Sequence, residues 1–112
     1  MKDNFTYIEH VLEAIRKIES YIKDTDFEKF SQNDLVFDAV VREITIIGEA
    51  SNRITDDFQK QYPDIPWHKV VSMRNVLIHD YMDVDKELVW ETCRKNLPEL
   101  KDIFSKILKS RA

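Results

Sequence analysis

Apolar residues recur at helical spacing through most of the chain, and this periodicity constrains the fold more than any other feature. The first apolar stripe consists of Phe5, Ile8, Leu12, Ile15, Ile18 and Ile22. The last consists of Leu88, Val89, Cys93, Leu97, Leu100, Ile103, Phe104, Ile107 and Leu108. One glycine and three prolines in 112 residues are typical of a helix-rich chain. We predict an all-α single domain over residues 1–112, an antiparallel four-helix bundle with an extra short helix.

Polar residues that can cap helices mark where the elements begin. The expected caps are Asp3 or Asn4, Ser31 or Asn33, Thr55 and Asp85. The helix from about Asp34 to Ile54 is apolar around most of its circumference, which predicts a central helix or one also buried against another subunit. Gly48 inside it costs about 1 kcal/mol relative to alanine, a cost that close approach of a neighbouring helix would justify. Pro98 predicts that the final helix is kinked or restarted near that residue.

The composition argues against several classes of protein. A single cysteine, Cys93, rules out an internal disulfide and any multi-thiolate metal site. No His/Glu pair has the spacing of a zinc protease, so we expect no metal and no cofactor. No apolar run approaches the length of a membrane span, so we expect no membrane partner. The N-terminal residues lack the apolar core of a signal peptide, which makes the cytoplasm the expected compartment.

Charge is distributed unevenly along the chain. The formal net charge is −4, whereas a protein that binds a polyanion usually presents a basic surface. Residues 94–112 nonetheless contain six Lys or Arg against two acids. This basic tail is interpreted first as a solvated helix face with cations near a helix C-terminus. The alternative is that it helps to bind RNA or an acidic partner.

The stretch from Arg74 to Tyr81 carries the strongest chemical signal. Arg74 stays charged and His79 titrates near neutrality, a combination that suits phosphate chemistry. On a regular helix the two positions lie roughly 140° apart, so they share a site most easily if the helix ends near His79. The ordinary alternative is an Arg–Asp surface pair with a histidine bonded to a backbone carbonyl. The other two histidines, His10 and His68, are expected to be structural or exposed.

Several segments closely resemble the HEPN superfamily, in particular its HepT branch. They are Ile46-Ile47-Gly48-Glu49-Ala50, Tyr62-Pro63-Asp64-Ile65-Pro66-Trp67, Met73 through Tyr81, Val89-Trp90-Glu91 and Leu97-Pro98-Glu99-Leu100. The core of the resemblance is the pattern R-x4-H-x-Y, which Arg74, His79 and Tyr81 match in full. The likeness extends from about residue 5 to 108.

This resemblance implies a helical toxin that forms a homodimer, or alternatively a higher oligomer, and cleaves RNA without a metal. Arg74 and His79 would then be the catalytic residues. The implied partner is a minimal nucleotidyltransferase antitoxin of the MntA type, as in a type VII toxin–antitoxin system. That partner would neutralise the toxin by transferring AMP from ATP to the motif tyrosine, Tyr81.

Four more residues are candidates for supporting the site: Glu49, Asn52, Asn75 and Asp80. Glu49 and Asn52 could orient the motif side chains or could be ordinary solvated or capping residues, and a helix-end cap is the simpler role for Asp80. A second function also fits the motif, because Arg and His bind phosphate without cleaving anything. In that interpretation the chain is a non-catalytic helical partner, or a nucleotide-presenting subunit, of a minimal nucleotidyltransferase.

Overall fold

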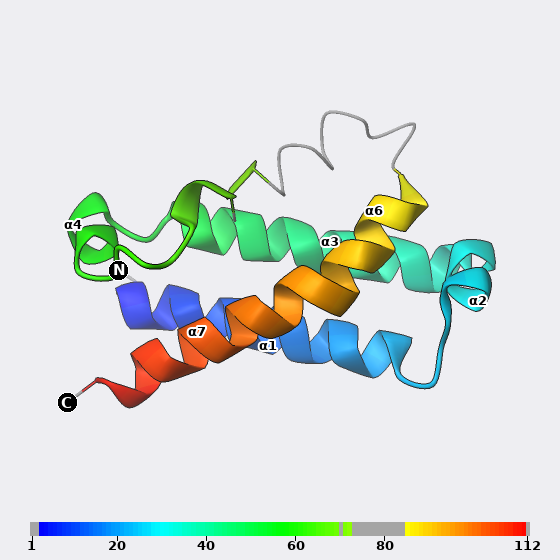
Figure 1. Ribbon diagram of the computed structural model, residues 1–112, viewed down its shortest axis with the longest axis horizontal. Coiled ribbons are helices and arrows are strands. Elements are labelled where there is room, and N and C mark those ends of the chain that lie inside the picture. The colour runs from blue at the N-terminus through cyan, green and yellow to red at the C-terminus, as the bar shows by residue number, and fades with distance from the viewer. Residues whose placement is uncertain (1–2, 70, 73–84, 112) are drawn as a thin grey trace.

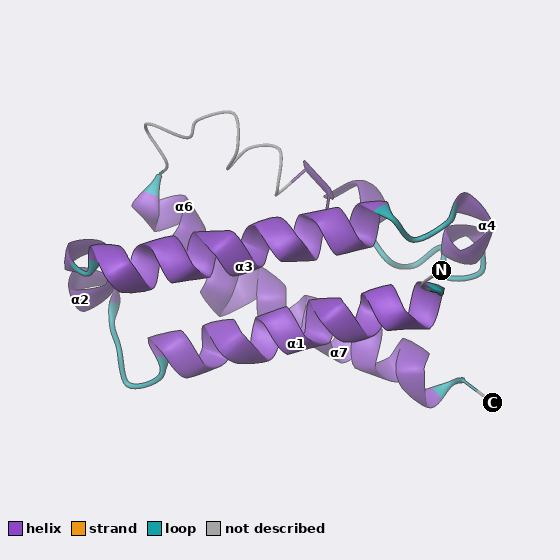
Figure 2. Cartoon of the chain, turned by 180° about the vertical axis from the view of Figure 1, so that it is seen from behind, coloured by secondary structure: helices purple, strands orange, loops and turns teal. Residues whose placement is uncertain are grey.

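The computed structural model of the chain describes residues 3–69, 71–72 and 85–111. Within these ranges all regular structure is helical and there is no strand, which confirms the all-α prediction. Helices α1 (Asn4–Ile22) and α3 (Asp34–Asn52) lie side by side in opposite directions. The C-terminal helices cross this pair obliquely on one side (Figure 1) and leave the other side of the pair uncovered by any described helix (Figure 2).

Helix α1 forms where the first apolar stripe was predicted. Its N-cap is Asp3, whose carboxylate accepts hydrogen bonds from the Thr6 backbone N–H at 2.8 Å and the Thr6 hydroxyl at 3.0 Å. The predicted stripe is buried apart from Phe5, which is half-buried. Val11 and Ala14 are buried as well, so the helix presents a wider apolar face to the core than a single stripe would.

The connection from α1 to α3 contains a short helix that the periodicity did not reveal. Asp24 has a positive φ of 61°, an uncommon conformation in which aspartate is one of the better tolerated residues. Helix α2 (Phe27–Gln32) follows, with Asp26 accepting from the Lys29 backbone N–H at 2.9 Å as its N-cap. Phe30 is fully buried, with its ring 5.1 Å from that of Trp90. These aromatic contacts fix the turn between the two long helices.

Helix α3 packs mainly against α1 and, near its start, against α2. Asn33 is its N-cap, through a hydrogen bond of 3.1 Å from the Val36 backbone N–H to its side-chain oxygen. The side facing the core contains Val40, Ile44 and Ile47, each with no exposed surface. Gly48 is buried too, consistent with an interior position where a larger side chain would need space. The broad apolar circumference is explained in part by half-buried side chains that pack on the edge of the core: Val36, Val41 and Ile46.

Two hydrogen bonds join the start of α1 to Thr55, in the short connection between α3 and α4. Asn4 accepts from the Thr55 backbone N–H at 2.9 Å and donates to the Thr55 hydroxyl at 3.3 Å. Thr55 also caps α4 (Asp56–Lys60), as predicted, by accepting from the Phe58 backbone N–H. The Thr55 side chain therefore both contacts the start of α1 and caps the next helix.

The C-terminal arm consists of α6 (Lys86–Glu91), the π-helical turn η1 (Thr92–Asn96) and α7 (Leu97–Lys109). Pro98 explains the π turn, because it has no N–H to donate and its ring would collide with the carbonyl of residue 94 in a continuous α-helix. The Leu97 N–H donates instead to the Thr92 carbonyl, five residues back. The predicted interruption near Pro98 is thus a π turn followed by a restarted α-helix.

One residue of the predicted final stripe is misplaced. Leu88 is 41% exposed, whereas its neighbour Val89 is fully buried. Two adjacent helical residues point about 100° apart, so both cannot face the same core. The rest of the stripe packs inward or lies half-buried at its edge, and Phe104 has no exposed surface.

Candidate functional site

The residues proposed for chemistry divide into two groups. Arg74, Asn75, His79, Asp80 and Tyr81 lie outside the described residues, so their geometry stays a prediction. The other two candidates, Glu49 and Asn52, lie on α3 and are exposed. They are three residues apart and therefore share one side of the helix. Two of the polar groups expected to support the site thus face outward.

The chain leading into the motif is fixed to the C-terminal arm. Ile65 is buried, and residues 67–69 and 71–72 are helical. The Trp67 indole N–H donates to the Tyr62 carbonyl at 3.1 Å, and its ring lies 5.6 Å from that of Phe104. Tryptophan supplies both a large apolar surface and one directed donor, so it holds position and orientation together. The Ile-Pro-Trp segment is a structural anchor for the start of the motif-bearing segment.

The chain leaving the motif is fixed as firmly. Asp85 caps α6 by accepting from the backbone N–H groups of Glu87 and Leu88, at 2.9 and 3.2 Å. Lys86 donates to the Ser31 carbonyl at 2.7 Å and lies 5.5 Å from the centre of the Phe37 ring. Its ammonium is also 3.6 Å from the carboxylate of Asp34. The exit from the motif is therefore tied to both α2 and α3.

Two polar residues on α3 are buried, and the sequence pattern did not single out either. Glu43 is 2% exposed, and its Oε2 lies 3.2 Å from a guanidinium nitrogen of Arg42, which is itself 73% exposed. Ser51 is fully buried, and no hydrogen-bond partner for its hydroxyl is present in the described structure. Each has polar neighbours in the sequence, Arg42 before Glu43 and Asn52 after Ser51, so a periodicity argument assigns both to the solvated side of the helix. Their burial is a result of tertiary packing.

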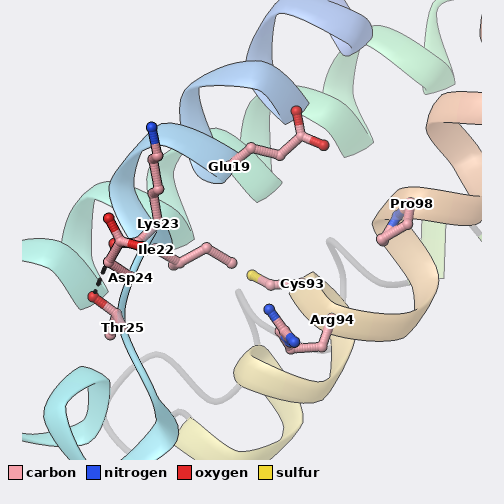
Figure 3. Close-up of a pocket in the computed structure, with 8 residues that line it drawn as sticks. All are labelled: Glu19, Ile22, Lys23, Asp24, Thr25, Cys93, Arg94 and Pro98. Carbon is pink, nitrogen blue, oxygen red and sulfur yellow. Dashed lines mark hydrogen bonds between the residues drawn. The ribbon is translucent and has the colours of Figure 1, made fainter.

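A groove of about 450 Å³ lies between the end of α1 and the π turn (Figure 3). Its lining includes Glu19, Lys23, Cys93 and Arg94. Burial raises the pKa of the Cys93 thiol to about 12, so the sulfur is protonated near neutral pH and is a poor nucleophile. The Glu19 carboxylate is already held by the Lys101 ammonium at 3.0 Å. The described lining of the groove has neither a histidine nor an activated thiol, and none of the motif residues belongs to it.

The basic tail is largely neutralised by ion pairs. Four of its cations lie within 3.2 Å of a carboxylate: Lys95 with Glu91, Lys101 with Glu19, Lys106 with Asp102 and Arg111 with Glu9. These pairs are solvent-exposed and each contributes little to stability. Arg94 instead lies 5.8 Å from the centre of the Trp90 ring. The arrangement favours the interpretation of the tail as a solvated helix face.

The described part of the chain contains no cluster of three or more His, Cys, Asp or Glu side chains that could hold a metal ion. No helix in the same ranges is both long enough and apolar enough to cross a membrane.

Comparison with known proteins establishes the family. Residues 11–107 match the family model described as ribonuclease HepT-like. A protein from Thermococcus cleftensis named probable ribonuclease HepT is 41% identical over 103 residues, covering 92% of this chain and 94% of that protein. The chain belongs to the ribonuclease HepT-like family.

A second relative, from Methanocaldococcus jannaschii, is also 41% identical, over 107 residues. Its name combines gamma-glutamylcyclotransferase with RNase. The chain spans 48% of that protein, although 96% of the chain is matched. No solved structure matches the chain significantly.

Proposed function

We propose that this protein is a metal-independent endoribonuclease toxin whose catalytic residues are Arg74 and His79. The observation that carries the proposal is that the ribonuclease HepT-like match runs from residue 11 to 107 and so includes the whole R-x4-H-x-Y pattern. The RNase names of the relatives point to the same substrate class.

The chemistry follows from what RNA itself provides. A base removes the proton of the ribose 2′-hydroxyl, and the 2′-oxygen attacks the adjacent phosphorus. The bond from phosphorus to the 5′-oxygen breaks as an acid protonates that oxygen, leaving a 2′,3′-cyclic phosphate and a 5′-hydroxyl. His79 is suited to proton transfer near neutral pH, and Arg74 to stabilising the charged phosphorane through two parallel hydrogen bonds.

A single imidazole cannot be neutral, as the base, and protonated, as the acid, at the start of the same step. A homodimer with two-fold symmetry supplies a second His79, so we infer that the site is shared by two copies of the chain. Glu49 and Asn52, both exposed on α3, are proposed as supporting residues, together with Asn75 and Asp80.

Regulation is proposed to act at Tyr81. A minimal nucleotidyltransferase encoded as the antitoxin would join the tyrosine oxygen to the α-phosphorus of ATP and release pyrophosphate. The AMP group would place negative charge two residues from His79, where it repels the RNA backbone and occupies the cationic site. Intact-mass measurement after co-expression with the partner should show increments of one AMP, absent from the Tyr81→Phe variant. An unmodified Tyr81 peptide would contradict this mode of control.

The activity test compares the wild-type protein with Arg74→Ala and His79→Ala on RNA in EDTA. His68→Ala and Arg16→Ala serve as matched controls, because both residues are exposed and lie outside the motif. Cleavage should survive chelation, persist in the controls and disappear in both motif variants. A substrate with a single 2′-deoxyribose at the cleaved position should remain intact. Cleavage that is lost in EDTA, or retained by His79→Ala, would refute the proposal.

A second function, a non-catalytic partner of a nucleotidyltransferase, is favoured by the net charge of −4. It predicts tight binding to the nucleotidyltransferase with no cleavage of any RNA at micromolar protein. The same set of variants separates the two, because only the ribonuclease loses a measured rate when His79 is replaced.

A further inference from the structure

The groove between the end of α1 and the π turn has the size and the lining of a ligand site. We call it the α1–η1 groove, after the two segments, within residues 19–25 and 93–98, that line it. Its volume of about 450 Å³ lies within the range of roughly 300–1,000 Å³ that is usual for small-molecule sites. Ile22 and Cys93 are both buried and point toward one another across its floor (Figure 3). Because the Cys93 thiol is protonated near neutral pH, this floor is apolar and uncharged.

The charges around the groove favour an anion. Two cations of the lining, Lys23 and Arg94, have no carboxylate partner in the described structure. Glu19 is neutralised by Lys101, whose ammonium lies 3.0 and 3.1 Å from its two carboxylate oxygens. Asp24 supplies the other carboxylate of the lining. Cations therefore outnumber carboxylates by three to two here, although the chain as a whole has a formal charge of −4.

An aromatic pair holds Arg94 in position. Its guanidinium carbon lies 5.8 Å from the centre of the Trp90 ring, and that ring lies 5.1 Å from the ring of the buried Phe30. A guanidinium over an aromatic face keeps its N–H donors at the edge of its plane, where two of them can bind one phosphate. Lys23 is exposed and lacks such a restraint, so its ammonium can follow the position of a ligand. The groove thus offers one directed and one adaptable contact to a phosphate.

A nucleotide of single-stranded RNA matches both features of the groove. Its phosphate suits the two unpaired cations, and the apolar faces of its ribose and base suit the floor formed with Pro98. Unpaired bases can turn out of a single strand, whereas a double helix keeps its bases stacked and presents mainly its backbone. An inorganic anion would leave the apolar floor uncovered. The membership of the chain in a ribonuclease family makes RNA the expected source of the nucleotide.

We propose that the α1–η1 groove binds a nucleotide of the substrate RNA outside the cleaved bond, with its phosphate at Arg94 and Lys23. The proposal rests on the ribonuclease function proposed above, and it separates affinity for the strand from the chemistry assigned to the motif. A phosphate contact releases counterions, so the affinity should fall as salt rises. One contact on a single strand contributes about −0.7 to the slope of log affinity against log salt.

The first test measures binding without cleavage. The probe is a fluorescein-labelled RNA of about 12 nucleotides with 2′-O-methyl groups throughout, which cannot be cleaved through the 2′-oxygen. Fluorescence anisotropy should show that the double variant Lys23→Ala with Arg94→Ala binds this RNA on the order of tenfold more weakly than the wild type. Its salt slope should be shallower by about 0.7. Arg94→Lys keeps the charge without the two parallel donors and should bind with intermediate affinity.

A matched pair of cations outside the groove controls for net charge. Lys17→Ala with Lys109→Ala removes the same charge from two exposed positions that do not line the groove. This double variant should bind the RNA nearly as well as the wild type, because exposed charges act over only about 10 Å at 0.1 M salt. Equal weakening by the groove pair and the control pair would overturn the proposal.

NMR titration of the wild-type chain locates the site without any substitution. The methyl resonances of Ile22 and the backbone amide of Arg94 should shift as the same RNA is added. Uridine monophosphate should shift them too at a higher concentration, because it has the phosphate and the apolar faces without the strand. Resonances that move with uridine monophosphate and not with RNA would identify a site for a free nucleotide and overturn the assignment to the substrate. RNA that binds without moving them would overturn it as well.

The outcomes separate this proposal from the proposed function. Circular dichroism confirms that each variant is folded before its affinity is interpreted. A chain that binds RNA through Arg94 and Lys23 and cleaves none would contradict the ribonuclease function and leave the groove standing as a nucleotide site. Cleavage that depends on His79, together with groove variants that bind RNA like the wild type, would overturn this inference alone.

Discussion

The α1–α3 pair and the C-terminal arm are held in different ways. Helices α1 and α3 have 19 residues each, begin at side-chain caps and join through aliphatic side chains with almost no exposed surface. The arm consists of three shorter pieces of 6, 5 and 13 residues, and two exposed ion pairs join α7 and the residues after it to α1. The comparison indicates that the pair has the larger continuous apolar contact, and that the arm packs through fewer buried side chains, among them Leu97, Phe104 and Ile107.

The largest effect is expected on the chemistry of Cys93, at the junction of the two regions. A pKa raised from 9.0 to about 12 lowers the thiolate fraction near neutral pH on the order of a thousandfold. Alkylation of the folded protein should therefore be slower by at least that factor than alkylation of the unfolded chain. Comparing the rate with and without denaturant checks this. Rapid alkylation of the native protein would show that the arm opens on its own.

Core truncation should destabilise the chain by several kcal/mol in either region. Phe104→Ala removes a fully buried ring that packs on Trp67, and it should lower the free energy of unfolding by about 3–5 kcal/mol. Ile44→Ala in the α1–α3 pair should lower it by about 2–5 kcal/mol, with Ile44→Val as a milder control. Urea titration followed by circular dichroism measures both.

The two truncations differ in what they should do to the thiol. Ile44→Ala should raise the rate of Cys93 alkylation only as much as its loss of unfolding free energy predicts. Phe104→Ala should raise that rate by more than its own loss of unfolding free energy predicts, because the arm would then open without global unfolding. Equal behaviour of the two variants would mean that the pair and the arm unfold as one unit.

Capping of α6 should matter less than the core but still measurably. Asp85→Ala removes an acceptor for two backbone N–H groups and should lower the free energy of unfolding by about 1 kcal/mol. Asp85→Asn, which keeps a capping oxygen, is the control and should stay close to the wild type. An Ala variant as stable as the Asn variant would show that water replaces this cap.

The ion pair between the arm and α1 should contribute least. Lys101→Ala removes a partner of Glu19 in a contact whose two side chains are 41% and 45% exposed, and the expected loss is about 0.2–1 kcal/mol. Adding salt should shrink the difference from the wild type. A loss of unfolding free energy well above that range would mean that this ion pair contributes more to holding the arm than an exposed pair usually does.

The N-cap of α1 should make the stability of the folded chain depend on pH. Hydrogen bonds from Thr6 hold the pKa of the Asp3 carboxyl below its usual range. A carboxyl whose pKa is lower when folded stabilises the folded state above its unfolded pKa, and this stabilisation disappears as the pH falls through the folded pKa. The Thr6 amide resonance should therefore shift at acid pH in the wild type and not in Asp3→Asn.

Much of the architecture could be predicted because its determinants are local. The stripe from Ile8 to Ile22 and the caps at Asp3, Asn33 and Asp85 depend on residues within one turn of one another, so a linear pattern contains them. Pro98 likewise acts on its own helix, although whether it produces a kink, a restart or a π turn depends on how the flanking helices must pack. Helix α2 was missed because six residues are too short to show a period.

The candidate site was predicted only as far as its residue types allow. Arg74, His79 and Tyr81 came from the motif, and the family match includes their positions without testing their roles. Glu43 and Ser51 gave no signal, since burial of a polar side chain depends on which helix faces it.

The sequence by itself determined the helical class, most helix boundaries and the family to which the chain belongs. These follow from the apolar periodicity, the capping residues and the motif, all of which can be recognised in the sequence alone. Only the tertiary structure decided which side of α3 the described helices leave uncovered, because an apolar circumference does not specify which side a neighbour will cover. It also decided that most of the tail cations are paired and that Cys93 is inert, since both depend on residues brought together from distant parts of the chain.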